Sequence, residues 1–169
     1  MNKIVLITGA SSGIGEGCAR KFASNGAKLI LNSRSVDKLN TLAQELKEKY
    51  GTESYVLPFD VRDRKAALEA LDSMPEEWKA IDILVNNAGL AVGLNPIQEG
   101  LLEDWERMID TNVKGLLYVS RKVLPWLVER KKGHVFTDFQ PIVYPEEIRH
   151  ISDDIFSMGS KIFAVDQHG

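Results

Sequence analysis

Three glycines near the start of the chain have the spacing of a turn that could hold a phosphate group. Gly9, Gly13 and Gly15 lie in residues 8–15, directly after the apolar run of residues 4–7. Glycine tolerates φ above zero and lets the backbone approach a ligand closely. Where a helix follows, the unpaired N–H groups of its first turn and the positive end of its dipole favour a pyrophosphate. An ordinary tight turn before a helix is the alternative.

The residues after the second apolar run indicate whether such a turn would bind NAD or NADP. The apolar run of residues 28–31 ends in Asn32, Ser33, Arg34 and Ser35. An NAD site needs a carboxylate here for the ribose 2′-hydroxyl group, whereas a 2′-phosphate needs a guanidinium. Arg34 stands at this place and no acidic residue does, so the sequence favours NADP over NAD. The alternative is a solvated arginine at the start of a helix.

A metal site is not expected. His150 and Asp154 are four residues apart and could share a helix face, but such residues are more often a solvated face near a frayed terminus. Cys18 is the only cysteine, so the chain can form neither an internal disulfide nor a thiolate cluster. This cysteine usage fits a reducing, cytoplasmic location.

Apolar runs alternate with helical patterns along the chain, and the strands and helices that they predict must position the glycine turn and Arg34. Strands are expected at residues 4–7, 28–31, 53–59, 81–85, 133–136 and 161–165, and helices after Gly15, over residues 37–49, 66–71 and about 102–130, and from Pro145. Because each strand is nearly all apolar, we expect one α/β domain over residues 1–169: a doubly wound, Rossmann-type parallel sheet of about six strands in three layers. The long helix is expected to turn these residues towards a core: Trp105, Met108, Ile109, Val113, Leu116, Leu117, Val119, Val123 and Leu124.

Composition excludes several classes of function. The chain has 169 residues, of which 44% are hydrophobic and 27% charged, and its net charge is −3. That charge gives no electrostatic reason to bind nucleic acid or an anionic membrane surface. The apolar runs are too short to span a bilayer, and no signal peptide is visible at the N-terminus. We therefore expect a globular protein without a nucleic-acid or membrane partner.

Four motifs together resemble the short-chain dehydrogenase/reductase family. They are the glycine turn of residues 8–15, Asp60-Val61, Asn86-Asn87-Ala88-Gly89, and Asn112 within residues 111–115, and they occur in the family's order and spacing. The similarity covers residues 1 to about 136. Residues 78–93 and 103–105 are most similar to the NADP-dependent 3-hydroxy acid (serine, allo-threonine) dehydrogenases. The resemblance implies hydride transfer between NADP(H) and a hydroxy acid, alcohol or carbonyl compound.

The resemblance also implies roles for individual residues. Asp60 would accept a hydrogen bond from the adenine amino group beside the Val61 backbone, and Asn112 would kink the long helix and hold a water in a proton relay. Each residue in isolation could instead be a strand cap or a turn residue. Related enzymes commonly pair through the long helix, so a homo-oligomer is one option. The dinucleotide-binding residues so implied are Gly9, Ser11, Ser12, Gly13, Ile14, Gly15, Asp60, Val61, Asn87, Ala88 and Gly89, beside Arg34.

The sequence departs from the family towards its end. The family's reaction uses a serine after the fifth strand, and a tyrosine whose pKa is lowered by a lysine four residues later. Gln140 stands at the serine position, and Tyr144 is followed by Ile148 at the place of the lysine. Tyr118 and Lys122 have the right spacing but precede the fifth strand, so we interpret them as surface neighbours on one helix.

Two hypotheses explain the atypical or shortened segment of residues 137–169. Either an internal deletion removed the serine and tyrosine–lysine region, or an unrelated C-terminal piece follows a truncated reductase. The residues that are present support dinucleotide binding, while the cofactor would carry the chemistry. A catalytically inactive dinucleotide-binding or scaffold protein is therefore the alternative to an NADP-dependent oxidoreductase. A fold without any ligand is a third option, and the substrate cannot be read from these residues.

Overall fold

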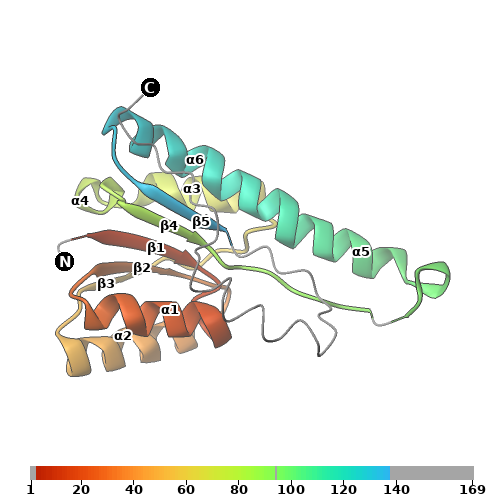
Figure 1. The fold of residues 1–169 in the computed structure, drawn as a ribbon, viewed down its shortest axis with the longest axis horizontal. Coiled ribbons are helices and arrows are strands. Elements are labelled where there is room, and N and C mark those ends of the chain that lie inside the picture. Colours follow the sequence, from red (N-terminus) through yellow and green to blue (C-terminus); the bar gives the residue numbers. More distant parts are fainter. Residues whose placement is uncertain (1–2, 94, 138–169) are drawn as a thin grey trace, which may run out of the picture.

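The fold is built on one parallel sheet at the centre of the molecule (Figure 1). The computed structural model describes residues 3–93 and 95–137. All neighbouring strands in this part of the chain are parallel, and their order is β3-β2-β1-β4-β5. The strands are β1 (Ile4–Thr8), β2 (Lys28–Asn32), β3 (Ser54–Val56), β4 (Ile83–Asn86) and β5 (His134–Thr137). The sixth strand expected at residues 161–165 lies outside the described residues.

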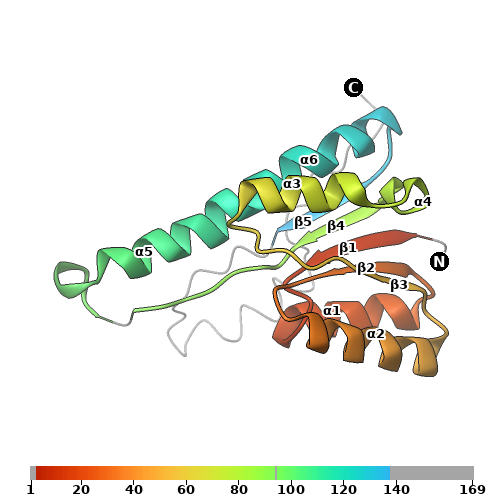
Figure 2. The same cartoon turned by 180° about the vertical axis from the view of Figure 1, so that it is seen from behind.

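Helices cover both faces of this sheet, as the doubly wound prediction requires. Figures 1 and 2 show α1 (Gly13–Ser24) and α2 (Val36–Tyr50) against one face, with α3 (Arg64–Ser73) and α6 (Leu116–Glu129) against the other. The sequence did not predict α4 (Glu76–Lys79) or the 3-10 turn η1 (Ile97–Glu99). The helix α5 (Leu102–Ile109) and the π-helical η2 (Asp110–Gly115) lead directly into α6. The predicted three-layer α/β class is confirmed.

The central strand β1 shows why two helical layers form. Side chains alternate across a strand, so its neighbours in sequence face opposite sides of the sheet. Val5 and Ile7 join the apolar cluster under α1 and α2, whereas Leu6 joins the cluster under α3 and α6. All three side chains are fully buried. A strand with two covered faces has no polar face, which explains the unbroken apolar run in the sequence.

The order of the strands also places a crevice at the end of β1. β1 pairs with β2 on one side and with β4 on the other, so the chain winds outward in opposite directions from these two neighbours. In doubly wound sheets, ligands bind beyond the carboxyl ends of the strands at such a switch point. The loops that follow β1, β2, β3 and β4 all reach this edge.

β3 is shorter than the predicted strand of residues 53–59. The Leu57 N–H still donates to β2 at 2.9 Å, but Pro58 has no N–H with which to continue the ladder. The Asn32 side chain then takes over, because its Nδ2 donates to the carbonyl oxygens of Leu57 at 3.0 Å and Phe59 at 3.1 Å. This buried amide fixes the path of the chain immediately before Asp60.

The long helical region is present, but its apolar residues do not all face the core as predicted. Val119 and Val123 are fully buried against the sheet and α3, and Trp105, Met108 and Leu116 are partly buried. Only one face of a helix can pack against a sheet. Because this helix has apolar residues on all its faces, those on the remaining faces are not covered by any of the described residues. None of the helices in residues 3–93 and 95–137 is long and apolar enough to cross a bilayer. The predicted core residues that are exposed are Ile109, Val113, Leu117 and Leu124.

Candidate dinucleotide-binding site

A cavity of about 560 Å³ lies at the carboxyl ends of the strands. Its size falls within the range of small-molecule sites. The loops after β1, β2, β3 and β4 form its wall together with η2. The predicted site residues in this wall are Gly9, Ser11, Ser12, Ile14, Arg34, Asp60, Val61, Asn87, Ala88, Gly89 and Asn112. Gly13 and Gly15 are the two predicted residues that lie outside it.

The glycine turn has the backbone geometry that its sequence predicts. Gly9 and Gly13 have φ values of +68° and +58°, in the left-handed region that favours glycine. A Cβ atom on Gly15 would overlap the carbonyl oxygen of Gly9, so the third glycine lets α1 pack against the turn. Ser12 is the N-cap of α1, but its side chain makes no capping hydrogen bond. The first turn of α1 therefore keeps N–H groups that suit an anion.

Hydrogen bonds tie the end of β1 to the end of β4. The Thr8 hydroxyl accepts the backbone N–H groups of Asn87 and Ala88, each at 3.0 Å. The Asn87 side chain returns the contact, since its Nδ2 donates to the carbonyl oxygens of Thr8 at 2.9 Å and Gly9 at 3.2 Å. Asn87 therefore holds the glycine turn in place, while Ala88 and Gly89 continue the cavity wall.

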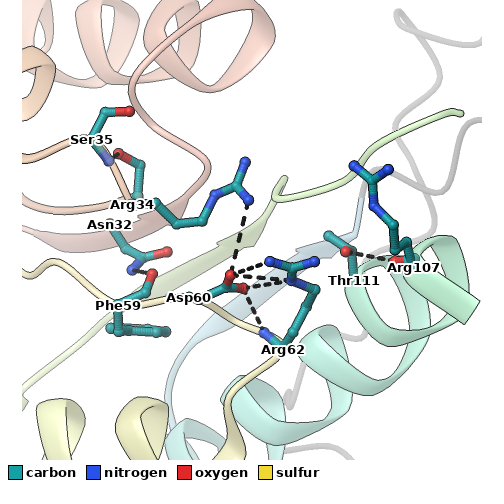
Figure 3. A network of polar contacts seen from close by, with 9 residues as sticks. Asn32, Arg34, Ser35, Phe59, Asp60, Arg62, Arg107 and Thr111 are labelled. Atoms are coloured by element: carbon teal, nitrogen blue, oxygen red, sulfur yellow. Dashed lines mark hydrogen bonds and ion pairs between the residues drawn. The ribbon is translucent and has the colours of Figure 1, made fainter.

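Asp60, a residue of the cavity wall, contacts two arginines (Figure 3). Arg62 Nη2 donates to Asp60 Oδ2 at 2.6 Å, and the Arg62 backbone N–H donates to Oδ1 at 3.0 Å. Arg34 Nη1 is 3.9 Å from the same Oδ2 atom. The side-chain hydrogen bond from Arg62 holds the pKa of Asp60 below its ordinary value although burial opposes this, and Asp60 raises the pKa of Arg62 in turn. The site thus contains a fixed carboxylate and two guanidinium groups.

Two buried amide oxygens in the wall test whether a nucleotide would fit. Asn32 and Asn86 are 1% and 4% exposed. Each Nδ2 atom donates a hydrogen bond, that of Asn32 to the Leu57 carbonyl oxygen at 3.0 Å and that of Asn86 to the Ser120 hydroxyl at 2.8 Å. Their Oδ1 atoms have no hydrogen-bond partner within the described residues. Because buried acceptors are rarely left unpaired, ribose hydroxyl or base amino groups would suit them. With the two guanidinium groups and the start of α1, the wall offers the chemistry that a nucleotide requires.

A family comparison identifies the architecture around this cavity. The family model described as short chain dehydrogenase matches residues 3–137. The chain belongs to this family. The match covers the glycine turn, Asp60-Val61, Asn86-Asn87-Ala88-Gly89 and Asn112, so the resemblance inferred from these motifs is confirmed.

Individual short chain dehydrogenases and reductases are similar to this family member over the same region. The NADP-dependent 3-hydroxy acid dehydrogenase YdfG of Escherichia coli strain K12 is 52% identical over 132 residues, which are 78% of this chain and 52% of that protein. A closed form of serine dehydrogenase complexed with NADP+ is also 52% identical, with a TM-score of 0.71 over 78% of this chain and 52% of that one. L-sorbose reductase from Gluconobacter frateurii, complexed with NADPH and L-sorbose, is 34% identical, with a TM-score of 0.72 over 78% and 50%. The chain spans about half the length of the curated relatives it matches.

In this member of the family, Asn112 ties the long helix to the loop after β4. Its Oδ1 accepts the Leu90 N–H and its Nδ2 donates to the Leu90 carbonyl, both at 2.9 Å. Asn112 lies in the π-helical η2, where the pairing of the long helix changes. The side chain therefore has a positioning contact in the cavity wall. Its role in a proton relay stays a prediction.

Tyr118 and Lys122 are separate from the cavity. Lys122 Nζ forms an ion pair with Asp72 of α3 and lies 5.7 Å from the centre of the Trp126 ring. Neither Tyr118 nor Lys122 is part of the cavity wall. The lysine thus joins α6 to α3, which agrees with its interpretation as a surface residue.

Ten residues of the wall were not predicted as site residues, and three of them carry polar contacts described above: Asn32, Asn86 and Arg62. The available signal for Arg62 was its spacing, since an aspartate often accepts the backbone N–H two residues further on. Gln140, Tyr144 with Ile148, and His150 with Asp154 lie outside the described residues. Among residues 3–93 and 95–137, no group of three or more His, Cys, Asp or Glu could hold a metal ion.

Proposed function

We propose that the cavity binds NADP(H) and that this chain is the dinucleotide-binding part of an oxidoreductase. The observation that carries the proposal is that Arg34 lines the same cavity as the glycine turn. No residue from position 32 to 36 is acidic, so the end of β2 offers no carboxylate to a ribose 2′-hydroxyl group. The NADP-dependent relative, and the similar structures complexed with NADP+ and NADPH, support the same choice.

Each part of the cavity suits one part of the dinucleotide. The first turn of α1 and the backbone of Gly9 would hold the pyrophosphate, where N–H groups favour an anion. Asp60 and the Val61 backbone would meet the adenine, as the family resemblance implies. Ala88 and Gly89 would line the path towards the nicotinamide. When bound, NADP(H) supplies or accepts the hydride, and the chain's residues orient it.

The activity that we infer is hydride transfer between NADP(H) and a hydroxy acid, alcohol or carbonyl compound. The names of the relatives support this class, since they include a 3-hydroxy acid dehydrogenase and a reductase of L-sorbose. Asn112 is proposed to hold a water for proton transfer, because it lies in the cavity wall. We propose a cytoplasmic location on the cysteine usage alone.

We also infer a homo-oligomer that forms through the helix of residues 102–129. The exposed side chains of Ile109, Val113 and Leu117 on this helix support the inference, because apolar patches on a surface commonly mark contacts between proteins. Light scattering after size-exclusion chromatography tests it. Leu117→Glu should release monomers, and a monomeric wild-type protein would contradict the inference.

Thermal unfolding with and without dinucleotide tests the proposed binding. A ligand at 100 times its Kd stabilises the folded state by about 2.7 kcal/mol, which raises the unfolding midpoint by about 5–10 °C. We expect this shift with NADPH, and a smaller one with NADH at the same concentration. Turnover of 3-hydroxy acids with NADP+ tests the activity. A shift without turnover would favour a binding protein, and no shift with either dinucleotide would refute the proposal.

A further inference from the structure

Two arginines compete for the Asp60 carboxylate, and one of them holds it almost completely. Arg62 makes four hydrogen bonds to it: Nη2 to Oδ2 at 2.6 Å, Nε to each oxygen at 3.1 Å, and the backbone N–H to Oδ1 at 3.0 Å. A carboxylate has about four lone-pair positions, so these contacts use nearly all of them. Arg34 reaches only to 3.9 Å from Oδ2.

The two side chains are also held to different degrees. The Arg62 side chain is 34% exposed, whereas that of Arg34 is 66% exposed. Within the described residues, the Arg34 guanidinium makes no hydrogen bond, and its long contact with Asp60 is its one ion pair. Figure 3 shows the two arginines reaching Asp60 from different directions, Arg34 from the end of β2 and Arg62 from the side of Thr111. Arg34 is therefore the guanidinium that is free to bind a ligand.

It matters that Arg62 and not Arg34 binds Asp60, because Asp60 and Arg34 line the same cavity and Arg34 would bind a 2′-phosphate. An unpaired carboxylate there would repel the phosphate. It would also attract the Arg34 guanidinium into a tighter ion pair, which would have to break before a phosphate could bind. The bidentate contact from Arg62 opposes both effects, because it neutralises the carboxylate and occupies most of its acceptor positions while leaving room for one more donor, such as the adenine amino group.

We propose that Arg62 is a positioning residue that selects the 2′-phosphorylated dinucleotide: by occupying Asp60, it leaves Arg34 available for the 2′-phosphate. The inference rests on the proposed NADP(H) function and adds to it a residue that does not touch the phosphate itself.

Calorimetric titration with two adenosine probes tests this role without any turnover. Adenosine 2′,5′-bisphosphate and 5′-AMP differ only in the 2′-phosphate, so the ratio of their Kd values isolates recognition of that group. Arg62→Gln should weaken binding of the bisphosphate about tenfold while 5′-AMP changes less than about twofold. Arg107→Gln is the matched control, because Arg107 pairs with Asp104 at 3.6 Å and is not part of the cavity wall. It should leave the ratio unchanged.

A double variant separates this role from a purely structural one. In Asp60→Asn/Arg62→Gln no carboxylate remains to trap Arg34 or to repel the phosphate, so the preference for the bisphosphate should return to within about threefold of the wild-type value. Any loss of the adenine contact affects both probes and cancels in the ratio.

Four results would overturn the proposal. Arg62→Gln could leave both Kd values unchanged, could weaken both probes equally, or could remain impaired when Asp60 is also changed. Each of these leaves the NADP(H) function intact and removes Arg62 from it. A wild-type chain that binds neither probe would instead refute the proposed function, and the role of Arg62 with it.

Discussion

Gly15 packs directly against the backbone of Gly9. A Cβ atom at Gly15 would overlap the Gly9 carbonyl oxygen and approach the side-chain amide of Asn87, which itself holds the ends of β1 and β4 together. The same packing brings the start of α1 to the cavity. The third glycine of the motif is therefore required by contact within the protein, whether or not a ligand is bound.

Gly15→Ala should lower the free energy of unfolding by about 1–3 kcal/mol, because an added methyl group must displace backbone rather than a flexible side chain. Gly17→Ala is a matched control in the same helix, where an added Cβ would meet no atom within 4 Å. It should be neutral or stabilising by up to about 1 kcal/mol, since alanine favours helix over glycine. Urea titrations of both variants provide the comparison, and equal losses of stability would contradict this packing.

Arg34→Asp should reverse the preference between the two dinucleotides. The change removes charge-assisted hydrogen bonds to the 2′-phosphate and adds a repulsive charge, so NADPH should bind about 30-fold more weakly or worse. NADH should change by less than about threefold, because its ribose hydroxyl can donate to the new carboxylate. Lys38→Asp, on an exposed residue of α2 outside the cavity wall, is the control for net charge. Equal losses for both dinucleotides would exclude Arg34 as the selecting residue.

The Asp60–Arg62 contact should contribute to stability in a pH-dependent way. The pKa of Asp60 is lowered from an ordinary value of 3.8, chiefly by the Arg62 hydrogen bond. A lowered carboxyl pKa stabilises the folded state above the ordinary value, and this contribution is lost as pH falls through the lowered one. The wild type should therefore exceed Asp60→Asn by about 1 kcal/mol at pH 7, with the difference shrinking below about pH 4. Urea midpoints from pH 7 to pH 2.5 measure it; a difference that grows in acid would have the wrong sign.

Tyr118 and Lys122 should matter for packing and not for the cavity. Lys122→Met removes the ion pair with Asp72 and should cost up to about 1 kcal/mol of stability. Tyr118→Phe should cost less, and both variants should keep the wild-type Kd for NADPH within about twofold, since neither residue lines the cavity. A tenfold loss of NADPH affinity in either variant would show that the pair belongs to the site.

Features that depend on local pattern were predictable from the sequence. The apolar run of β1 and the left-handed turn at Gly9 follow from residue types alone, because strand burial and positive φ are local demands. Arg34 was also predicted, because it follows the apolar run of residues 28–31 in the sequence. Its position close to Asp60 could also have been predicted, because both residues follow strands of one parallel sheet, whose carboxyl ends lie at the same edge.

Features that depend on distant partners were not predictable. The Arg62 contact was missed because a charged residue after a strand is usually solvated, and its orientation depends on the path of the chain after Phe59. That path is fixed by Asn32, which is 25 residues from Leu57 in sequence and bonds to its carbonyl. Ile109 and Leu117 were placed in the core for a related reason: their apolarity was visible, but the face of the helix that meets the sheet was not.

Calorimetric titration of the wild-type protein, first with NADPH and then with NADH, tests the central claim most directly. Heat is the suitable signal, because none of Trp78, Trp105 and Trp126 is part of the cavity wall. We predict one saturable site that binds NADPH at least about tenfold more tightly than NADH, as expected for one set of charge-assisted contacts to the 2′-phosphate. Equal affinity, or tighter binding of NADH, would contradict the role of Arg34. No heat with either dinucleotide would mean that the glycine turn serves the architecture alone.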